Sequence, residues 1–136
     1  MSDAGCPECG FKLWLPIADL EVSSLGLYDD ARFPGRCILV FHQHVEHFDE
    51  LGVEDACAYT EDGRRVGRAI AQVVGASRIN YAILGNTQPH LHMHLIPRQL
   101  EEPKPSRTPW EHPGAPRPLA PDQASGIVED LRRALR

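Results

Sequence analysis

The clearest alternation of polar and apolar positions lies in residues 79–98, which read INYAILGNTQPHLHMHLIPR. Three histidines occupy alternate positions there, with an apolar residue after each one. They are His90, His92 and His94, followed in turn by Leu91, Met93 and Leu95. A period of two is typical of a strand, whose successive side chains point to opposite faces. The pattern therefore predicts that the three imidazoles converge on one face of a sheet while the apolar side chains enter a core.

Other stretches predict the elements around this strand. Residues 35–41 are almost continuously apolar, which indicates a buried strand, and a shorter strand is expected to end near residue 30. Residues 80–84 predict a further strand leading towards the histidines. Residues 53–75 predict the main helix, in which Gly63 marks a point where the helix can break. Its apolar stripe consists of Val66, Ile70, Val73 and Val74, while Arg64, Arg65 and Arg68 are expected to form a solvated face.

The end of the chain has a different composition. Residues 101–118 contain six prolines, so no regular element is expected there. A short terminal helix is predicted to begin at Pro121, with Ile127, Leu131 and Leu135 on one stripe. The elements together predict an α+β fold, in which an antiparallel sheet carries one long packed helix and a short C-terminal helix. We expect residues 101–136 to be part of the same domain as residues 1–100.

Length and charge limit the classes of function. A chain of 136 residues that is 42% hydrophobic can bury one core but not two. A net charge of −5 argues against a nucleic-acid groove, although a small phosphorylated ligand needs only a local positive site. The sequence has no 18-residue apolar run and no signal segment, which predicts a cytoplasmic protein without a membrane partner.

The four cysteines divide into two kinds. In a cytoplasmic protein, disulfides are not expected, so Cys37 and Cys57 are interpreted as small core residues. Cys6 and Cys9 form a Cys-x-x-Cys pair followed by glycine, a common arrangement for presenting two thiolates to a tetrahedral metal. A redox pair and two incidental thiols near the terminus remain alternatives.

Three interpretations compete for the histidines. They can form the polar face of an ordinary half-buried strand, or a three-histidine zinc site with an open position for water. In the third interpretation, His92 attacks a phosphorus atom while its neighbours hold phosphate oxygens. Upstream residues 85–89 include the carboxamides of Asn86 and Gln88. These groups suit phosphate and sugar oxygens better than a bare metal, which favours the third interpretation.

Residues 90–96 match the motif His-φ-His-φ-His-φ-φ, where φ is apolar, at every position. In this they resemble the histidine-triad (HIT) superfamily of nucleotidyl hydrolases and transferases, in particular its bacterial branch similar to diadenosine polyphosphate hydrolases. Residues 33–40 and 42–44 also resemble the superfamily's Pro-Gly-His-φ-φ-φ-φ strand and the Lys-x-His that trails it. Arg36 departs from this pattern, because most members have a fourth histidine there. The resemblance covers residues 26–98.

The resemblance implies a HIT-like fold, a homodimer and a small nucleotide substrate. The implied enzyme cleaves at the α-phosphorus of dinucleoside polyphosphates or related adenylates through a nucleotidyl-histidine intermediate on His92. His94, with Asn86 or Gln88, would hold the oxygens that gain charge. Alternatives are a nucleoside phosphoramidase, a zinc-dependent hydrolase that uses the three histidines as ligands, and a non-catalytic nucleotide-binding module. Trp110 is expected to contact the nucleotide pocket or a partner subunit, with local packing as the alternative.

The resemblance also implies a structural zinc in an N-terminal knuckle within residues 1–100. Carried over residue by residue, its ligands are Cys6, Cys9, His44 and His90, and either His42 or His47 can replace His44. An acidic or amide residue near the end of the strand before residue 30 binds ribose in the superfamily. Asp29 and Asp30 are both candidates, and the alternative is that both are ordinary turn carboxylates.

Overall fold

The computed structural model describes residues 5–136, which form one five-stranded antiparallel sheet in the order β1-β2-β3-β5-β4. The strands are β1 (Leu15–Asp19), β2 (Ser23–Leu27), β3 (Cys37–Phe41), β4 (Arg78–Ala82) and β5 (His92–Arg98). The α-helices are α1 (Val53–Val74) and α2 (Pro121–Ala134), and single 3-10 turns occupy η1 (Phe48–Glu50) and η2 (Pro109–Glu111). This architecture confirms the predicted α+β fold with one long and one short helix.

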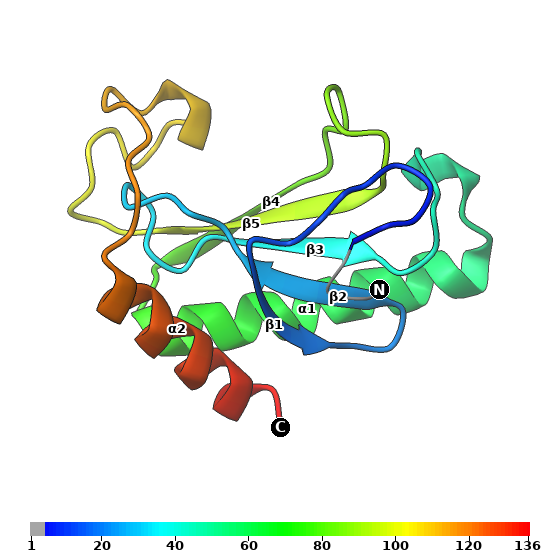
Figure 1. Ribbon diagram of the computed structural model, residues 1–136. Coiled ribbons are helices and arrows are strands. Elements are labelled where there is room, and N and C mark those ends of the chain that lie inside the picture. The colour runs from blue at the N-terminus through cyan, green and yellow to red at the C-terminus, as the bar shows by residue number, and fades with distance from the viewer. Residues whose placement is uncertain (1–4) are drawn as a thin grey trace.

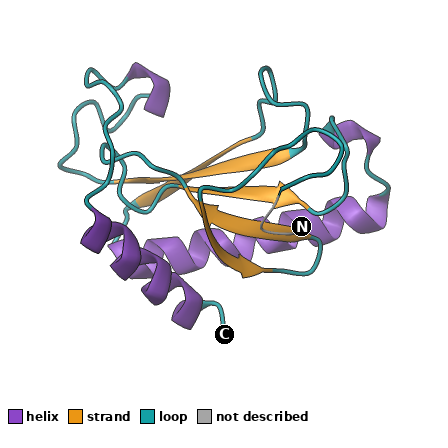
Figure 2. Ribbon diagram, in the orientation of Figure 1, coloured by secondary structure: helices purple, strands orange, loops and turns teal. Residues whose placement is uncertain are grey.

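The two faces of the sheet are covered differently. Figure 1 shows α1 lying along one side of the sheet, with the N-terminal segment and the arm after β5 on the other side. The odd-numbered residues of β3, such as Leu39, join Met93 and Leu95 in the large core against α1. Val40 instead belongs to a second cluster with Phe11 and Cys6. The loop-covered face, visible in Figure 2, is therefore the face that receives His92 and His94.

Helix α1 follows its apolar stripe without a break. Val66 and Ile70 are fully buried, and the helix passes Gly63 and ends at Gly75, which caps it with a left-handed φ of 66°. Gly63 has no side chain, which leaves room for Met93 against the helix. This close packing compensates for the poor helix propensity of glycine. The three arginines on the other side are exposed, as predicted. Cys57 is also exposed, so its interpretation as a core residue was wrong.

The C-terminal part closes the large core. Helix α2 begins with Pro121, and its buried face consists of Ala124, Ile127, Val128 and Leu131, which join the cluster around the sheet. The Pro-rich arm does contain one regular turn, η2, where Thr108 and Glu111 form a reciprocal capping box. The prediction of no regular element there was therefore slightly too strong. Within residues 5–136, no helix is both long and apolar enough to cross a lipid bilayer.

Asp62 of α1 ties the β1–β2 turn to the helix. Its buried carboxylate accepts hydrogen bonds from the backbone N–H of Val22 at 3.0 Å and the Ser23 hydroxyl at 2.6 Å. Asp62→Ala leaves both donors without that acceptor, so we expect the free energy of unfolding to fall by about 1–3 kcal/mol. Urea denaturation measures this change. Glu129→Ala, an exposed substitution on α2, is the control, and an equal loss in both variants would contradict the role of Asp62.

Candidate active site and metal site

Two of the three histidines lie together on the loop-covered face of the sheet. His92 and His94 alternate along β5, with ring centroids 5.3 Å apart. His92 is buried and packs against Phe11 at 5.1 Å, whereas His94 is half-buried and lies 5.8 Å from the Tyr28 ring. The two imidazoles are thus walled by aromatic rings from the N-terminal segment and from the end of β2.

The tautomer of His92 follows from one hydrogen bond. Its Nδ1 lies 2.7 Å from the backbone carbonyl oxygen of His90, and because a carbonyl only accepts, Nδ1 carries the proton. In the neutral ring, Nε2 then has a free lone pair. His92 therefore presents a nucleophilic nitrogen rather than an N–H group.

His94 has the opposite arrangement because of Arg36. The Arg36 guanidinium lies 3.1 Å from His94 Nδ1 and can only donate, so Nδ1 accepts and the ring proton is on Nε2. Burial lowers the pKa of His94 to about 4, and the charges of Arg36 and His92 add to the effect. Neighbouring imidazoles thus differ in chemistry: His92 offers a lone pair and His94 a hydrogen-bond donor.

Arg36 is held in place from two sides. Its guanidinium lies 4.0 Å from the centre of the Tyr28 ring and donates to Asp30 at 3.1 Å. The Asp30 side chain is fully buried, and its oxygens also accept from Arg32. Burial alone would raise the pKa of Asp30, but hydrogen bonds from Arg32 and the two positive charges hold it below its usual value. Asp30 therefore stabilises Arg36 inside the protein.

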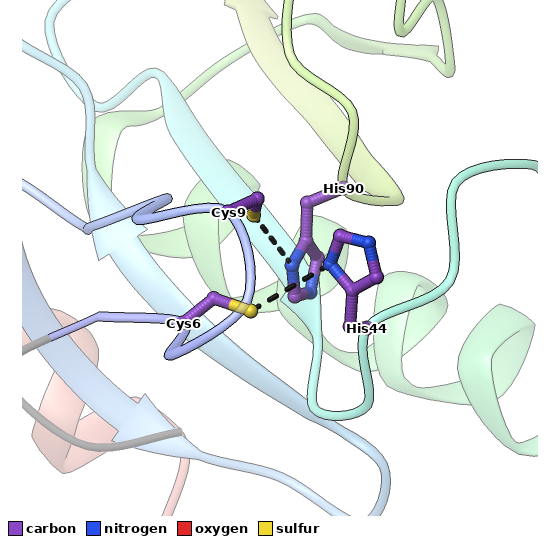
Figure 3. A group of neighbouring side chains, drawn as sticks. All are labelled: Cys6, Cys9, His44 and His90. Carbon is purple, nitrogen blue, oxygen red and sulfur yellow. Dashed lines mark hydrogen bonds between the residues drawn. The ribbon is translucent and has the colours of Figure 1, made fainter.

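A second group of side chains lies behind His92. Figure 3 shows Cys6 and Cys9 of the N-terminal segment facing His44 and His90. Cys6 Sγ lies 3.6 Å from His44 Nδ1, Cys9 Sγ lies 3.5 Å from His90 Nδ1, and all four ligand atoms lie within 4.8 Å of one another. Tetrahedral zinc, with bonds of about 2.3 Å to sulfur and about 2.1 Å to nitrogen, separates such ligands by about 3.6 Å. The four residues fit a closed tetrahedral metal site.

The donor chemistry also fits a metal. Burial opposes ionisation of Cys6, yet hydrogen bonds from the backbone of Cys9 and Glu8 and from His44 lower its pKa to about 6. Burial raises the pKa of Cys9, and the adjacent Cys6 adds to this rise. One thiolate thus forms readily, and a cation is needed to stabilise the second beside it.

The three imidazoles share Phe11 as a neighbour but do not converge on one point, because His90 has other partners. This residue precedes β5, and its Nε2 donates to the Phe41 carbonyl at 2.7 Å while its Nδ1 faces Cys9. Both ring nitrogens of His90 therefore have other partners, so neither is free to join His92 and His94. The geometry does not form a three-histidine metal site.

A comparison with protein families matches the HIT domain to residues 17–101, which is more than half of the chain. The chain belongs to the HIT family. No protein with a curated description matches it in sequence. A histidine triad protein from Bradyrhizobium japonicum is similar in structure, with 25% identity, a TM-score of 0.82 and 90% of each chain covered.

Two more distant HIT structures share the fold. A Zn-bound histidine triad family protein from Mycobacterium smegmatis has 22% identity and a TM-score of 0.64, with 88% of this chain and 82% of that chain covered. Diadenosine triphosphate hydrolase from Plasmodium falciparum has 15% identity and a TM-score of 0.62, with coverages of 88% and 73%. At these identities, the likeness supports the fold alone.

The remaining predicted residues of this HIT protein lie in several different places. Asp29 is half-buried and accepts from the Leu119 backbone N–H at 2.8 Å, while it also lines a pocket with Tyr28. Asn86 and Gln88 are exposed in the β4–β5 loop, where Gly85 lines a hollow of about 200 Å³ together with His92. Of the alternative metal ligands, His44 is the one that joins the cysteines; His42 instead lies 3.8 Å from Asp19.

Sequence reasoning missed the contacts that tune this HIT site. Nothing in the local pattern around Arg36 pointed to His94, which is 58 residues away. Phe11, which packs on both His90 and His92, was also missed. The available signals were the arginine at a position where a histidine was expected and a lone aromatic just after the Cys-x-x-Cys pair.

Removing the Arg36 charge tests its effect on His94. In Arg36→Met, the donor to Nδ1 and the nearby positive charge are both lost, so protonation becomes easier and the pKa of His94 rises from about 4. Because burial still disfavours the charged ring, the pKa should stay below the ordinary value of about 6.5. NMR titration of the labelled histidine ring measures it. Arg32→Met retains the Arg36 contact and is the control; an unchanged pKa in Arg36→Met would contradict the assignment.

Proposed function

We propose that this protein is a nucleotide hydrolase or transferase that cleaves at the α-phosphorus through a nucleotidyl-histidine intermediate on His92. The observation that carries the proposal is the 2.7 Å hydrogen bond between His92 Nδ1 and the His90 carbonyl, which leaves the Nε2 lone pair for attack. Family membership supports the same class of reaction. The relative from Plasmodium falciparum is a diadenosine triphosphate hydrolase, which agrees with a dinucleoside polyphosphate substrate.

The proposed reaction has two displacement steps. His92 Nε2 attacks the α-phosphorus, a P–N bond forms, and the P–O bond to the leaving phosphate breaks with its electron pair on that oxygen. Water then attacks the same phosphorus and gives its proton to the solvent, while the P–N bond breaks and its electron pair returns to Nε2. Another acceptor in place of water gives transfer instead of hydrolysis.

His94 complements this attack as a donor. Its Nε2 carries the proton because Arg36 occupies Nδ1, and the neutral ring stays a donor well below neutral pH. A fixed donor beside the phosphorus stabilises an oxygen that gains charge in the transition state. Asn86 and Gln88 are proposed to supply further amide donors from the β4–β5 loop.

A pocket of about 340 Å³ next to the histidine pair suits the nucleoside. It is lined mainly by apolar and aromatic side chains, with Asp29 at one side. The wall residues that matter here are Phe11, Trp14, Leu27, Tyr28 and Ile38. Phe11 contacts His92 and Tyr28 contacts His94, so a base in this pocket brings its α-phosphate near both rings. Between the two candidates for ribose, we propose Asp29, because the carboxylate of Asp30 is sealed against Arg32 and Arg36.

We also propose that Cys6, Cys9, His44 and His90 bind a structural zinc. The bound ion would join the N-terminal segment to the residue that precedes the catalytic strand. The proposed reaction does not use this ion. His90 accepts the hydrogen bond of His92 with its backbone carbonyl oxygen, whereas its ring faces Cys9. The homodimer implied by the resemblance is retained as a proposal, since β4 is an edge strand open to pairing.

The zinc proposal predicts about one ion per chain in protein purified without added metal. Cys9→Ser removes one thiolate, so metal content and melting temperature should both fall. Cys57→Ser changes an exposed thiol on α1 and should retain both values. Elemental analysis and thermal unfolding are the measurements. Metal-free wild-type protein with an unchanged melting temperature would remove the proposal.

The nucleophile proposal predicts that His92→Ala lacks turnover of diadenosine triphosphate while it remains folded. His94→Ala should still form the adduct but react about 10²–10³-fold more slowly, as expected for loss of one transition-state donor. Rapid quench with mass spectrometry should detect one nucleotidyl group on His92 in the wild-type chain. His42→Ala, which changes a histidine beside Asp19, is the control. Near wild-type turnover by His92→Ala would exclude the covalent route.

A further inference from the structure

A second and larger cavity lies on the catalytic face, between β4 and the Pro-rich arm. Its volume is about 630 Å³, and its walls include Arg78, Asn80, Arg107 and Trp110. In the register of β4 with β5, Ala82 pairs with His94, Asn80 with Ile96 and Arg78 with Arg98. Directly paired residues point to the same face of a sheet. The β4 wall of this cavity therefore continues the surface that bears His94.

The cavity is connected to the histidine pair through Trp110. The Trp110 ring lies 6.5 Å from the His94 ring and is about half exposed. On the opposite side of His94, Tyr28 lies at 5.8 Å and lines the smaller pocket. His94 therefore stands between two cavities, each with an aromatic wall.

The arm is fastened over β4 by a buried ion pair. Arg98, only 4% exposed, pairs with Glu102 at 3.0 Å and donates to Asn80 at 2.7 Å. It also donates to the backbone carbonyl of Arg107 at 2.7 Å. These bonds hold both walls of the cavity at fixed positions. The cavity is consequently a built feature of the fold.

Two cations remain available to a ligand there. Arg78 is exposed and, among residues 5–136, no hydrogen bond or ion pair is recorded for its side chain. Arg107 is mostly exposed, with Glu111 as a loose partner at 3.6 Å. Arg98 is already neutralised by Glu102, so the free positive charge comes from Arg78 and Arg107. This local charge contrasts with the net charge of −5 for the whole chain.

We propose that this cavity binds the leaving nucleotide of the reaction, a nucleoside phosphate or polyphosphate. Arg78 and Arg107 contact its outer phosphates, and Trp110, the wall residue next to His94, lines the path between the two cavities. The proposal rests on the proposed function: the nucleoside that becomes attached to His92 occupies the smaller pocket, and the other half of the substrate extends past His94. When the P–O bond breaks, the electron pair stays on the leaving phosphate, whose added charge the two arginines stabilise.

The site distinguishes between leaving groups. A dinucleoside polyphosphate fills both cavities, whereas an adenylate that releases only ammonia has nothing to place beside Arg78 and Arg107. The arginine contacts should thus raise kcat/KM for the first substrate and leave the second unaffected. This difference separates binding of the leaving group from the chemistry at His92.

The test compares diadenosine triphosphate with adenosine 5′-phosphoramidate in the double variant Arg78→Ala/Arg107→Ala. We expect kcat/KM for diadenosine triphosphate to fall roughly 10- to 100-fold, as for the loss of two charge-assisted contacts, with less than about twofold change for the phosphoramidate. The matched control is Arg64→Ala/Arg65→Ala, which removes the same charge from the solvated face of α1. Size-exclusion chromatography verifies that each variant keeps the wild-type assembly.

Each outcome separates the two proposals. Equal losses with both substrates, no loss with either, or the same selective loss in the α1 control would overturn the leaving-nucleotide site while the proposed function stands. A changed assembly in Arg78→Ala/Arg107→Ala would also overturn it, because the arginines would then hold subunits together. If the wild-type protein turns over neither substrate, the proposed function itself fails, and the site is rejected with it.

Discussion

The hydrogen bond from His92 Nδ1 to the carbonyl oxygen of His90 is the constraint on which the rest of the site depends. It fixes the proton of His92 on Nδ1 and leaves the lone pair on Nε2. That carbonyl is itself fixed by the side chain of the same residue. His90 Nε2 donates to Phe41 at the end of β3, and its Nδ1 faces Cys9. One residue therefore connects the metal-site geometry, the β3–β5 pairing and the tautomer of the proposed nucleophile.

Arg36 stands where most members of the family have a histidine, and it changes the chemistry of the neighbouring His94. A guanidinium cannot accept a hydrogen bond, so its partner His94 must accept at Nδ1 and keep its proton at Nε2. A buried cation also needs a counter-charge, which Asp30 provides, and Arg32 shares that carboxylate. The acidic residues after β2 thus have separate roles, since Asp30 stabilises the arginine and Asp29 faces the smaller pocket.

The division of the sheet into two faces explains where the chemistry lies. Helices α1 and α2 bury the apolar side chains of one face, so the other face is left for irregular segments. The Cys-x-x-Cys segment covers it near His92, and the Pro-rich arm covers it beyond His94. Loops offer varied side chains and free backbone groups, while the sheet beneath them holds the histidines rigidly.

What the sequence determined by itself was local and periodic. Alternation along residues 90–96 predicted a strand with its apolar side chains in the core, and the spacing of valines with a terminal glycine predicted α1 and its end. The Cys-x-x-Cys pair indicated thiolates near one point, and the resemblance named His44 and His90 beside them. Tertiary structure decided the rest: it selected His44 over His42, turned His90 away from the other two imidazoles, and paired Arg36 with His94 across 58 residues. The physical reason is that backbone periodicity acts within a few residues, whereas hydrogen-bond partners and ring nitrogens are chosen only when distant strands meet.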